Sequence, residues 1–180
     1  VGVINVTGSF PPDKVNGFMI AGMPAPNRDF THPPELYDTL TKEIGGYKQD
    51  ADPFLYGYAI SRDTFIDDAY KTEENRERAV LHFMKKHEWD FFMVVFSSLD
   101  RIQHFFWKYL DSKHPTFDPK EAEQYKKVIP ELYQKMDEIT GNLIENLEKD
   151  DTVIIASDHG FNAQRYVFHL DYWLKKLQLL

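Results

Sequence analysis

The sequence predicts an α/β fold in which a mostly parallel sheet is sandwiched by helices, within one domain of residues 1–180. Short apolar runs of strand length alternate along the chain with amphipathic segments of ten residues or more. Such alternation is typical of parallel sheets whose crossover helices cover the sheet faces. The 180 residues suffice for one ordinary domain, and the chain has no internal repeat, low-complexity tract or clear linker.

Three apolar runs are expected to form buried strands. They are residues 1–6, 89–97 and 152–156, and the second has the continuous apolar character of a strand that is covered on both faces. A short extended piece is also expected at 57–61. The stretch 7–34 holds six prolines and three glycines and is expected to be mostly loop and turn.

Apolar residues at helical spacing predict the helices. In the long amphipathic segment 64–87, Ala69, Val80, Phe83 and Met84 are expected to face inward. Pro130 is expected to break or restart the helical region around it, because proline cannot donate a backbone hydrogen bond. The expected helices span residues 35–44, 64–87, 100–110, 120–149 and 172–177.

Charge and composition exclude several classes of function. The net charge of −8 and the lack of a Lys/Arg stripe argue against a nucleic-acid-binding surface. No apolar run approaches the length of a membrane span. The absence of cysteine excludes a disulfide scaffold and thiolate chemistry.

The two ends of the chain are expected to be cuts through ordered structure. The chain opens on a β-branched run without Met and closes on Leu-Gln-Leu-Leu at 177–180, a largely apolar end. Termini of natural proteins are usually polar and exposed. We therefore expect a domain that is incomplete at both ends.

Asp100 and His104 form the first candidate site. Asp100 follows the expected strand 89–97, and open α/β sheets bind ligands at the carboxyl ends of their strands. On a helix the two side chains share one face, where a carboxylate and an imidazole can bind one divalent cation. The alternative is structural: Asp100 favours the helix dipole and His104 packs among aromatic neighbours. Arg101 is expected to be a surface charge or a local salt-bridge partner.

Asp158 and His159 form the second candidate site. They follow the expected strand 152–156, and Gly160 permits the turn that lets two adjacent side chains converge. The alternative is an ordinary Asx-type turn that contains a histidine by chance.

The two pairs can together supply half of a binuclear metal site if their strands lie side by side. Oxygen and nitrogen donors without sulfur suit zinc, manganese or iron. Four ligands are too few for two cations, so further protein groups are required. The candidate ligands are Asp100, His104, Asp158 and His159.

These residues resemble motifs of the type I phosphodiesterase/nucleotide pyrophosphatase branch of the alkaline phosphatase superfamily, especially its uncharacterised prokaryotic members. The segment 157–161 resembles the most diagnostic segment of the family, and 99–107 resembles its second metal motif. Residues 3–12 and 15–24 are similar to the loop-rich connection between the family's motifs. The resemblance spans nearly the whole chain.

The resemblance implies an alkaline-phosphatase-like catalytic core with two divalent metal ions, zinc being expected and manganese an option. One ion would be held by Asp100, His104 and a downstream His. The other would be held by Asp158, His159, an upstream Asp and the nucleophile. That nucleophile, a Thr or Ser which attacks phosphorus and forms a covalent intermediate, is expected upstream of residue 1, so no catalytic residue is assigned here.

The function that the resemblance implies is metal-dependent hydrolysis of a phosphodiester or nucleotide pyrophosphate bond in a small-molecule substrate. The chain by itself is expected to be inactive, because it lacks the nucleophile. Two alternatives stay open: a sulfatase- or phosphomutase-like enzyme on the same core, and a non-catalytic metal-binding domain. The sequence determines neither the substrate nor the oligomeric state.

Overall fold

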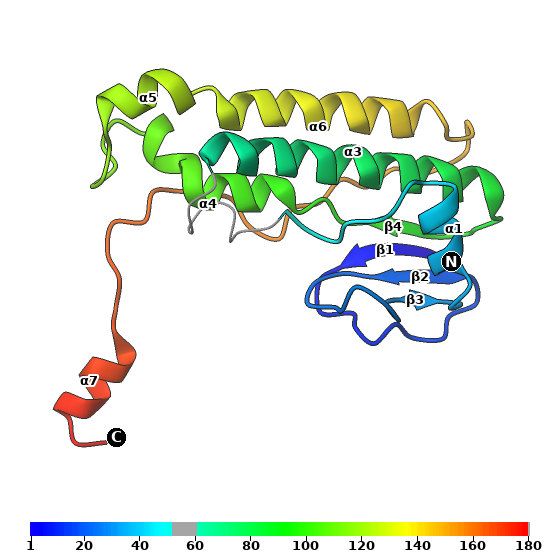
Figure 1. Cartoon of the computed structure of the whole chain (residues 1–180), viewed down its shortest axis with the longest axis horizontal. Coiled ribbons are helices and arrows are strands. Elements are labelled where there is room, and N and C mark those ends of the chain that lie inside the picture. Colours follow the sequence, from blue (N-terminus) through cyan, green and yellow to red (C-terminus); the bar gives the residue numbers. More distant parts are fainter. Residues whose placement is uncertain (52–60, 180) are drawn as a thin grey trace.

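A computed structural model describes residues 1–51 and 61–179 of the chain. In this part of the chain, a small sheet lies beside a layer of helices, and a long loop leads away to a separate terminal helix (Figure 1). The extended piece expected at 57–61 falls, except for its last residue, outside the described residues. No helix in the described ranges is long and apolar enough to cross a membrane.

The sheet is mixed and has the strand order β3-β2-β1-β4. Strand β1 pairs in parallel with β2 and with β4, whereas β2 and β3 are antiparallel. Strand β1 confirms the strand expected at the start of the chain. The strands are β1 (Gly2–Val6), β2 (Phe18–Ala21), β3 (Thr31–His32) and β4 (Phe92–Val94).

Strands β2 and β3 lie in the stretch that was expected to be mostly loop. The dense prolines and glycines around them dominate the local pattern, but Phe18–Ala21 is an apolar run between Gly17 and Gly22. Both glycines are required by close backbone approach. A Cβ at Gly17 would lie 2.0 Å from the carbonyl oxygen of Val1, and one at Gly22 would lie 2.6 Å from that of Asn5.

The helices expected at 35–44, 64–87, 100–110 and 172–177 are confirmed with changes of one or two residues at their ends. The helical region expected at 120–149 is divided into two helices at 126–127 and ends at 144. Helix α4 begins two residues before Asp100, and Pro130 occupies the third position of α6, where its missing N–H has no intrahelical acceptor to lose. The helices are α1 (Leu36–Lys42), α3 (Arg62–Lys86), α4 (Ser98–Leu110), α5 (Pro119–Tyr125), α6 (Val128–Ile144) and α7 (Leu170–Lys176).

The first hydrophobic core lies between the sheet and the helices α1 and α3. It joins Ile4 and Ile20 of the sheet to Leu40 of α1 and Phe83 of α3, all of which are buried. The face of β4 that points away from this core is accessible to solvent, since Met93 is 41% exposed and the preceding Phe91 is 54% exposed. The expectation that this strand is covered on both faces is therefore wrong: Phe92 and Val94 pack against the core, whereas the other face of the strand stays accessible in the described structure.

The second core binds the helices to one another. Helices α3, α4 and α6 lie side by side in Figure 1, with α5 at one end. Their facing sides are apolar and include several aromatic rings, of which Phe65 and Phe106 are stacked. The buried residues are Ala51, Phe65, Ala69, Ile102, Phe106, Tyr109, Ala122, Tyr125, Val128, Ile129 and Leu132.

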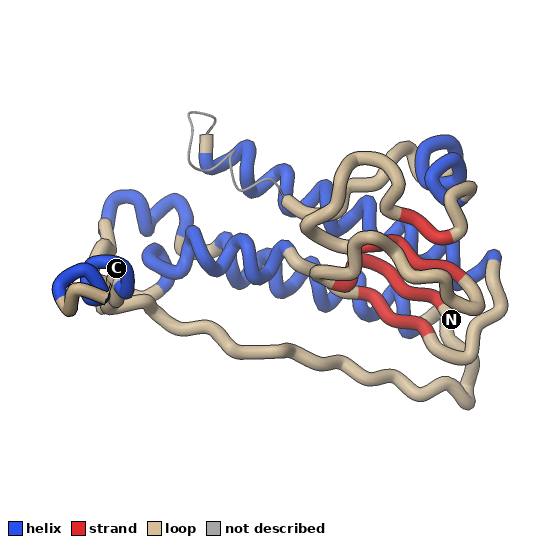
Figure 2. Tube along the Cα trace, turned by 90° about the horizontal axis from the view of Figure 1, so that it is seen from below, coloured by secondary structure: helices blue, strands red, loops and turns tan. Residues whose placement is uncertain are grey.

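The buried strand expected at 152–156 is wrong. These residues form no strand, and Ile154 and Ile155 are 84% and 76% exposed. Figure 2 shows the loop between α6 and α7 running past the helices without joining the sheet. A β-branched run favours an extended backbone, but a strand also needs a neighbour for its N–H and C=O groups. No strand of the described sheet pairs with this run.

A buried ion pair in α3 holds the start of α4. Glu73 and Arg76 are fully buried and paired with each other, and the amide N–H of Ser98 donates to Glu73 Oε1 at 2.7 Å. Arg76 also donates from Nη2 to the carbonyl oxygen of Gln49 at 2.5 Å. One carboxylate therefore connects α3 to the first residue of α4 and, through Arg76, to the loop before residue 51.

We predict that Glu73→Ala lowers the free energy of unfolding by about 3–5 kcal/mol, because it leaves the buried Arg76 without its countercharge. Denaturant unfolding followed by circular dichroism measures the change. The matched control is Glu77→Ala, one turn further along α3, where the side chain only accepts from Asn142 in an exposed contact. The control should lower the free energy of unfolding by less than about 1 kcal/mol. An equal decrease in both variants would contradict the role given to Glu73.

Candidate functional site

Asp100 and His104 lie on one face of α4, as the spacing predicts. Asp100 is in the first turn of the helix, and its Oδ1 is 3.3 Å from His104 Nε2. Both side chains are accessible, Asp100 being 34% and His104 58% exposed. The first candidate pair is therefore a contacting pair at the surface, and His104 is not packed away among the aromatic residues that follow it.

Two buried carboxylates fix the position of this pair. Glu73 accepts from the amide of Ser98, and Asp50, whose side chain is 4% exposed, accepts from the hydroxyl of Ser97 at 2.8 Å. The start of α4 has no side-chain cap of its own from Ser97. Carboxylates that are far away in sequence therefore accept the hydrogen bonds at the start of α4 and orient the turn that carries Asp100.

Asp50 and Glu73 are not among the site residues predicted from the sequence. For Glu73 a signal was present: it stands with Ala69, Arg76 and Val80 at the spacing of one helix face, so a charged pair occupies an inward-facing stripe. No local pattern marks Asp50, because its partners are 47 and 51 positions further along the chain.

Asp158 and His159 lie in a tight local turn. The amide of His159 donates to Asp158 Oδ1 at 3.0 Å, and the hydroxyl of Ser157 donates to the carbonyl oxygen of His159 at 2.6 Å. The ring of His159 donates from Nδ1 to the carbonyl oxygen of Gly160 at 2.9 Å, since a carbonyl can only accept. This contact fixes the tautomer and leaves Nε2 to face other groups.

The two predicted pairs meet at His159. Its Nε2 is 3.7 Å from Asp158 Oδ2 and 4.0 Å from Asp100 Oδ1, the oxygen that also faces His104. Residues more than fifty positions apart are thus brought together without the neighbouring strands from which their proximity was expected. Asp100 follows β4, whereas Asp158 follows the unpaired run 152–156.

Phe161 attaches the turn to α4. Its ring centroid lies 4.9 Å from that of His104, 5.4 Å from that of Trp107 and 6.3 Å from that of His159. Further along, Arg165 donates to the carbonyl oxygen of Lys113 at 3.0 Å. The second half of the site is therefore held on the first by an aromatic cluster and by a hydrogen bond beyond it.

The pKa of His159 is raised above its ordinary value of 6.5. The hydrogen bond to the Gly160 carbonyl is the main cause, and the negative charge of Asp158 adds to it, with a smaller contribution from Asp100. Desolvation acts in the opposite direction. The imidazolium form consequently persists to higher pH than in an unperturbed histidine.

The distances within individual pairs of these side chains are close to those between two ligands of one divalent cation. Two nitrogen or oxygen ligands of one tetrahedral zinc ion lie about 3.4 Å apart, and the contacts above range from 3.3 to 4.0 Å. The tautomer of His159 also fits, because metal-bound histidines commonly donate their other ring nitrogen to a carbonyl group. Within residues 1–51 and 61–179, however, no group of three or more His, Asp or Glu side chains is arranged so that it could hold a metal ion.

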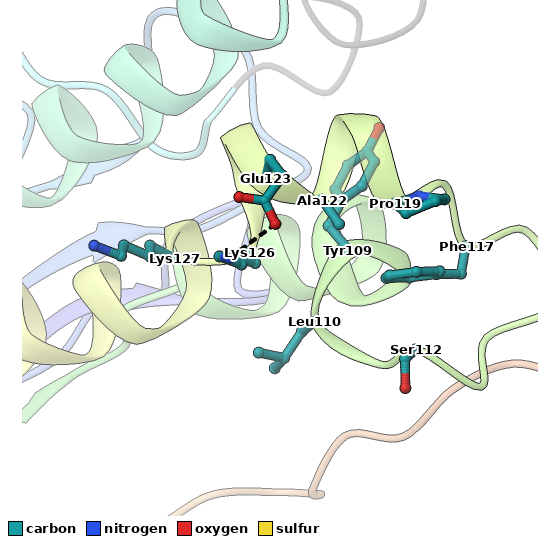
Figure 3. A pocket seen from close by; sticks show the side chains of 9 residues that line it. All are labelled: Tyr109, Leu110, Ser112, Phe117, Pro119, Ala122, Glu123, Lys126 and Lys127. Carbon is teal, nitrogen blue, oxygen red and sulfur yellow. Dashed lines mark hydrogen bonds and ion pairs between the residues drawn. The ribbon is translucent and has the colours of Figure 1, made fainter.

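Two hollows lie near the carboxyl-terminal part of α4. One, of about 430 Å³, borders the candidate site and is lined by His104, Trp107 and Phe161 together with residues 114–116 and 164–167. The other, of about 450 Å³, lies between the end of α4 and α5, and Figure 3 shows Tyr109, Phe117 and the Glu123–Lys126 ion pair on its wall. The second hollow contains none of the four candidate ligands.

A comparison with models of protein families identifies the family of the chain. A family model for type I phosphodiesterase/nucleotide pyrophosphatase matches residues 6–180. The chain belongs to this family. It is therefore a hydrolase of the phosphodiesterase/nucleotide pyrophosphatase class, and the family predicted from the sequence is confirmed. No curated protein and no solved structure matches the chain.

We predict that the pKa of His159, measured by NMR titration of the ring, lies above 6.5 and falls in Asp158→Asn. The substitution removes a nearby negative charge that favours the imidazolium form, while the hydrogen bond to Gly160 remains. The control is Asp118→Asn, which removes a carboxylate from the start of α5 and should leave the titration of His159 unchanged. A pKa in Asp158→Asn equal to that of the wild type would contradict the assigned cause.

Proposed function

We propose that the chain supplies one half of a two-metal site to an enzyme that cleaves a phosphodiester or nucleotide pyrophosphate bond in a small-molecule substrate. Asp100 and His104 would hold one divalent cation, and Asp158 and His159 the other, zinc being expected and manganese an option. The attacking Thr or Ser, an upstream Asp and a downstream His would come from outside residues 1–180, in a single alkaline-phosphatase-like domain.

The observation that carries this proposal is the meeting of the two motifs at Asp100 Oδ1. An ordinary Asx turn gives no reason for His159 to approach a carboxylate on a different element. Two metal ions about 3.5–4 Å apart, as in binuclear hydrolases, require their ligand sets to adjoin in this way. The family match supports the same chemistry.

When bound, the two cations would lower the pKa of the attacking hydroxyl and neutralise charge on the phosphoryl oxygens. The residues of this chain prepare the donors for that task. Asp100 presents Oδ1 between the two imidazoles, and the Gly160 carbonyl keeps the proton of His159 on Nδ1 so that Nε2 is the donor. Phe161 keeps the turn against α4. The hollow beside His104 is where we place the organic group of the substrate.

We predict that the full chain binds Zn²⁺ and that Asp158→Asn and His159→Ala each weaken binding by more than about 100-fold. Loss of an outer hydrogen-bond partner alone weakens metal sites by about 10–100-fold, so loss of a direct ligand should exceed that range. Isothermal titration calorimetry measures the affinity. His114→Ala is the matched control, since His114 lines the adjoining hollow and contacts Thr116 instead of the four ligands.

Equal zinc affinity in wild type, Asp158→Asn and His159→Ala would show that the turn is only structural. Affinity that depends on these residues in a complete enzyme without hydrolytic activity would favour the non-catalytic metal-binding domain. A preference of the complete enzyme for sulfate esters would favour the sulfatase-like alternative.

We predict that residues 1–180 with zinc bound show no turnover of an aryl phosphodiester, because the proposed nucleophile lies outside them. Release of the nitrophenolate from bis(p-nitrophenyl) phosphate, followed by absorbance, measures the rate. Turnover above that of a His159→Ala control would place a nucleophile within residues 1–180 and would contradict this part of the proposal.

A further inference from the structure

Asp50 is a buried carboxylate that accepts hydrogen bonds from a backbone amide, a hydroxyl group and a guanidinium group. Its Oδ1 accepts from the amide of Ala51 at 2.9 Å and from the hydroxyl of Ser97 at 2.8 Å. Its Oδ2 accepts from Nε and Nη2 of Arg101, both at 2.7 Å. An ionised carboxylate with so little exposure requires a countercharge, and Arg101 supplies it.

The third nitrogen of the same guanidinium reaches Asp100. Nη1 of Arg101 lies 3.2 Å from Asp100 Oδ2. The guanidinium is planar and its donors have fixed directions, so the two contacts with Asp50 determine where Nη1 points. Arg101 thereby fixes the accessible carboxylate of Asp100 relative to the buried carboxylate of Asp50.

The two oxygens of Asp100 consequently face different groups. Oδ2 faces Arg101, whereas Oδ1 faces Nε2 of His104 at 3.3 Å and Nε2 of His159 at 4.0 Å. A carboxylate with two equivalent oxygens could bind a cation through either or both of them. Here one oxygen is already engaged by a hydrogen-bond donor of fixed direction.

We propose that Arg101 is a positioning residue that occupies Oδ2 of Asp100 and makes Asp100 a one-oxygen metal ligand through Oδ1, with Asp50 as the anchor of Arg101. This inference rests on the proposed function, because it takes Asp100 as a metal ligand. The charge of Arg101 is balanced by Asp50, so the guanidinium orients the ligand without adding an unbalanced positive charge beside a cation.

The test uses the full chain loaded with Co²⁺, whose visible absorption reports coordination number and whose affinity is measured by titration. Arg101→Gln frees Oδ2, so Asp100 can bind through both oxygens. We expect weaker visible absorption, because a second oxygen of Asp100 raises the coordination number of the bound Co²⁺, and an affinity lower by about 10–100-fold because the ligand is no longer oriented. Arg101→Lys keeps the charge that Asp50 needs but loses the planar fork, and it should also change the spectrum.

The matched control is Arg78→Gln on the exposed side of α3, which should leave both the spectrum and the affinity as in the wild type. Thermal unfolding of each variant accompanies the titration, because a merely stabilising role would change the melting temperature without changing the spectrum of the bound protein. The conservative Lys variant keeps the test decisive if Arg101→Gln does not fold.

The outcomes separate this inference from the function on which it rests. If the wild type binds Co²⁺, His104→Ala abolishes binding at the site of Asp100 and both Arg101 variants retain the wild-type spectrum and affinity, then the positioning role is wrong and the metal site stands. If the wild type does not bind Co²⁺, or binds it equally well in His104→Ala and in His159→Ala, both proposals are overturned. A changed spectrum in both Arg101 variants with an unchanged Arg78→Gln supports the positioning role.

Discussion

The buried carboxylate of Glu73 is the constraint on which the candidate site depends. It balances the charge of Arg76 inside the helix layer and accepts the amide proton of Ser98, so the position of α4 is tied to that of α3. Because neither charge can remain alone in a low-dielectric interior, the two helices and the loop bonded to Arg76 are constrained together. The accessible end of this arrangement is the turn of α4 that carries Asp100.

The two halves of the site are held by different kinds of force. The half on α4 rests on charged hydrogen bonds to buried groups, which fix direction as well as distance. The half at 157–161 rests on the ring of Phe161 and on ion pairs between exposed side chains, which are individually weak and sensitive to salt. The geometry of the complete site should therefore vary mostly through the turn that carries His159.

Periodicity was sufficient to predict most of the fold. Helical spacing located α3, α4 and α6, because their apolar stripes are long enough to exclude other periods. It failed where the outcome depends on a distant partner. Residues 152–156 have the composition of a strand and no strand beside them, whereas Phe18–Ala21 forms one among prolines and glycines because β1 is its neighbour.

The same distinction applies to the site. Asp100, His104, Asp158 and His159 were found from residue type and spacing, and the structure brings them together. Their metal-binding role remains a proposal. The groups that orient them could not be derived in the same way: Asp50 acts on α4 from about fifty residues away, and its contacts exist only once the chain has folded.

The exposed run 152–156 also affects how the protein behaves in concentrated solution. Val153, Ile154 and Ile155 combine high β-propensity with open backbone groups, and β4 offers a sheet edge with Met93 exposed. Such segments are templates for pairing between molecules, which leads to association edge to edge. The net charge of −8 opposes the approach of two copies. Because salt screens that repulsion, low ionic strength is the condition under which the chain should stay dispersed.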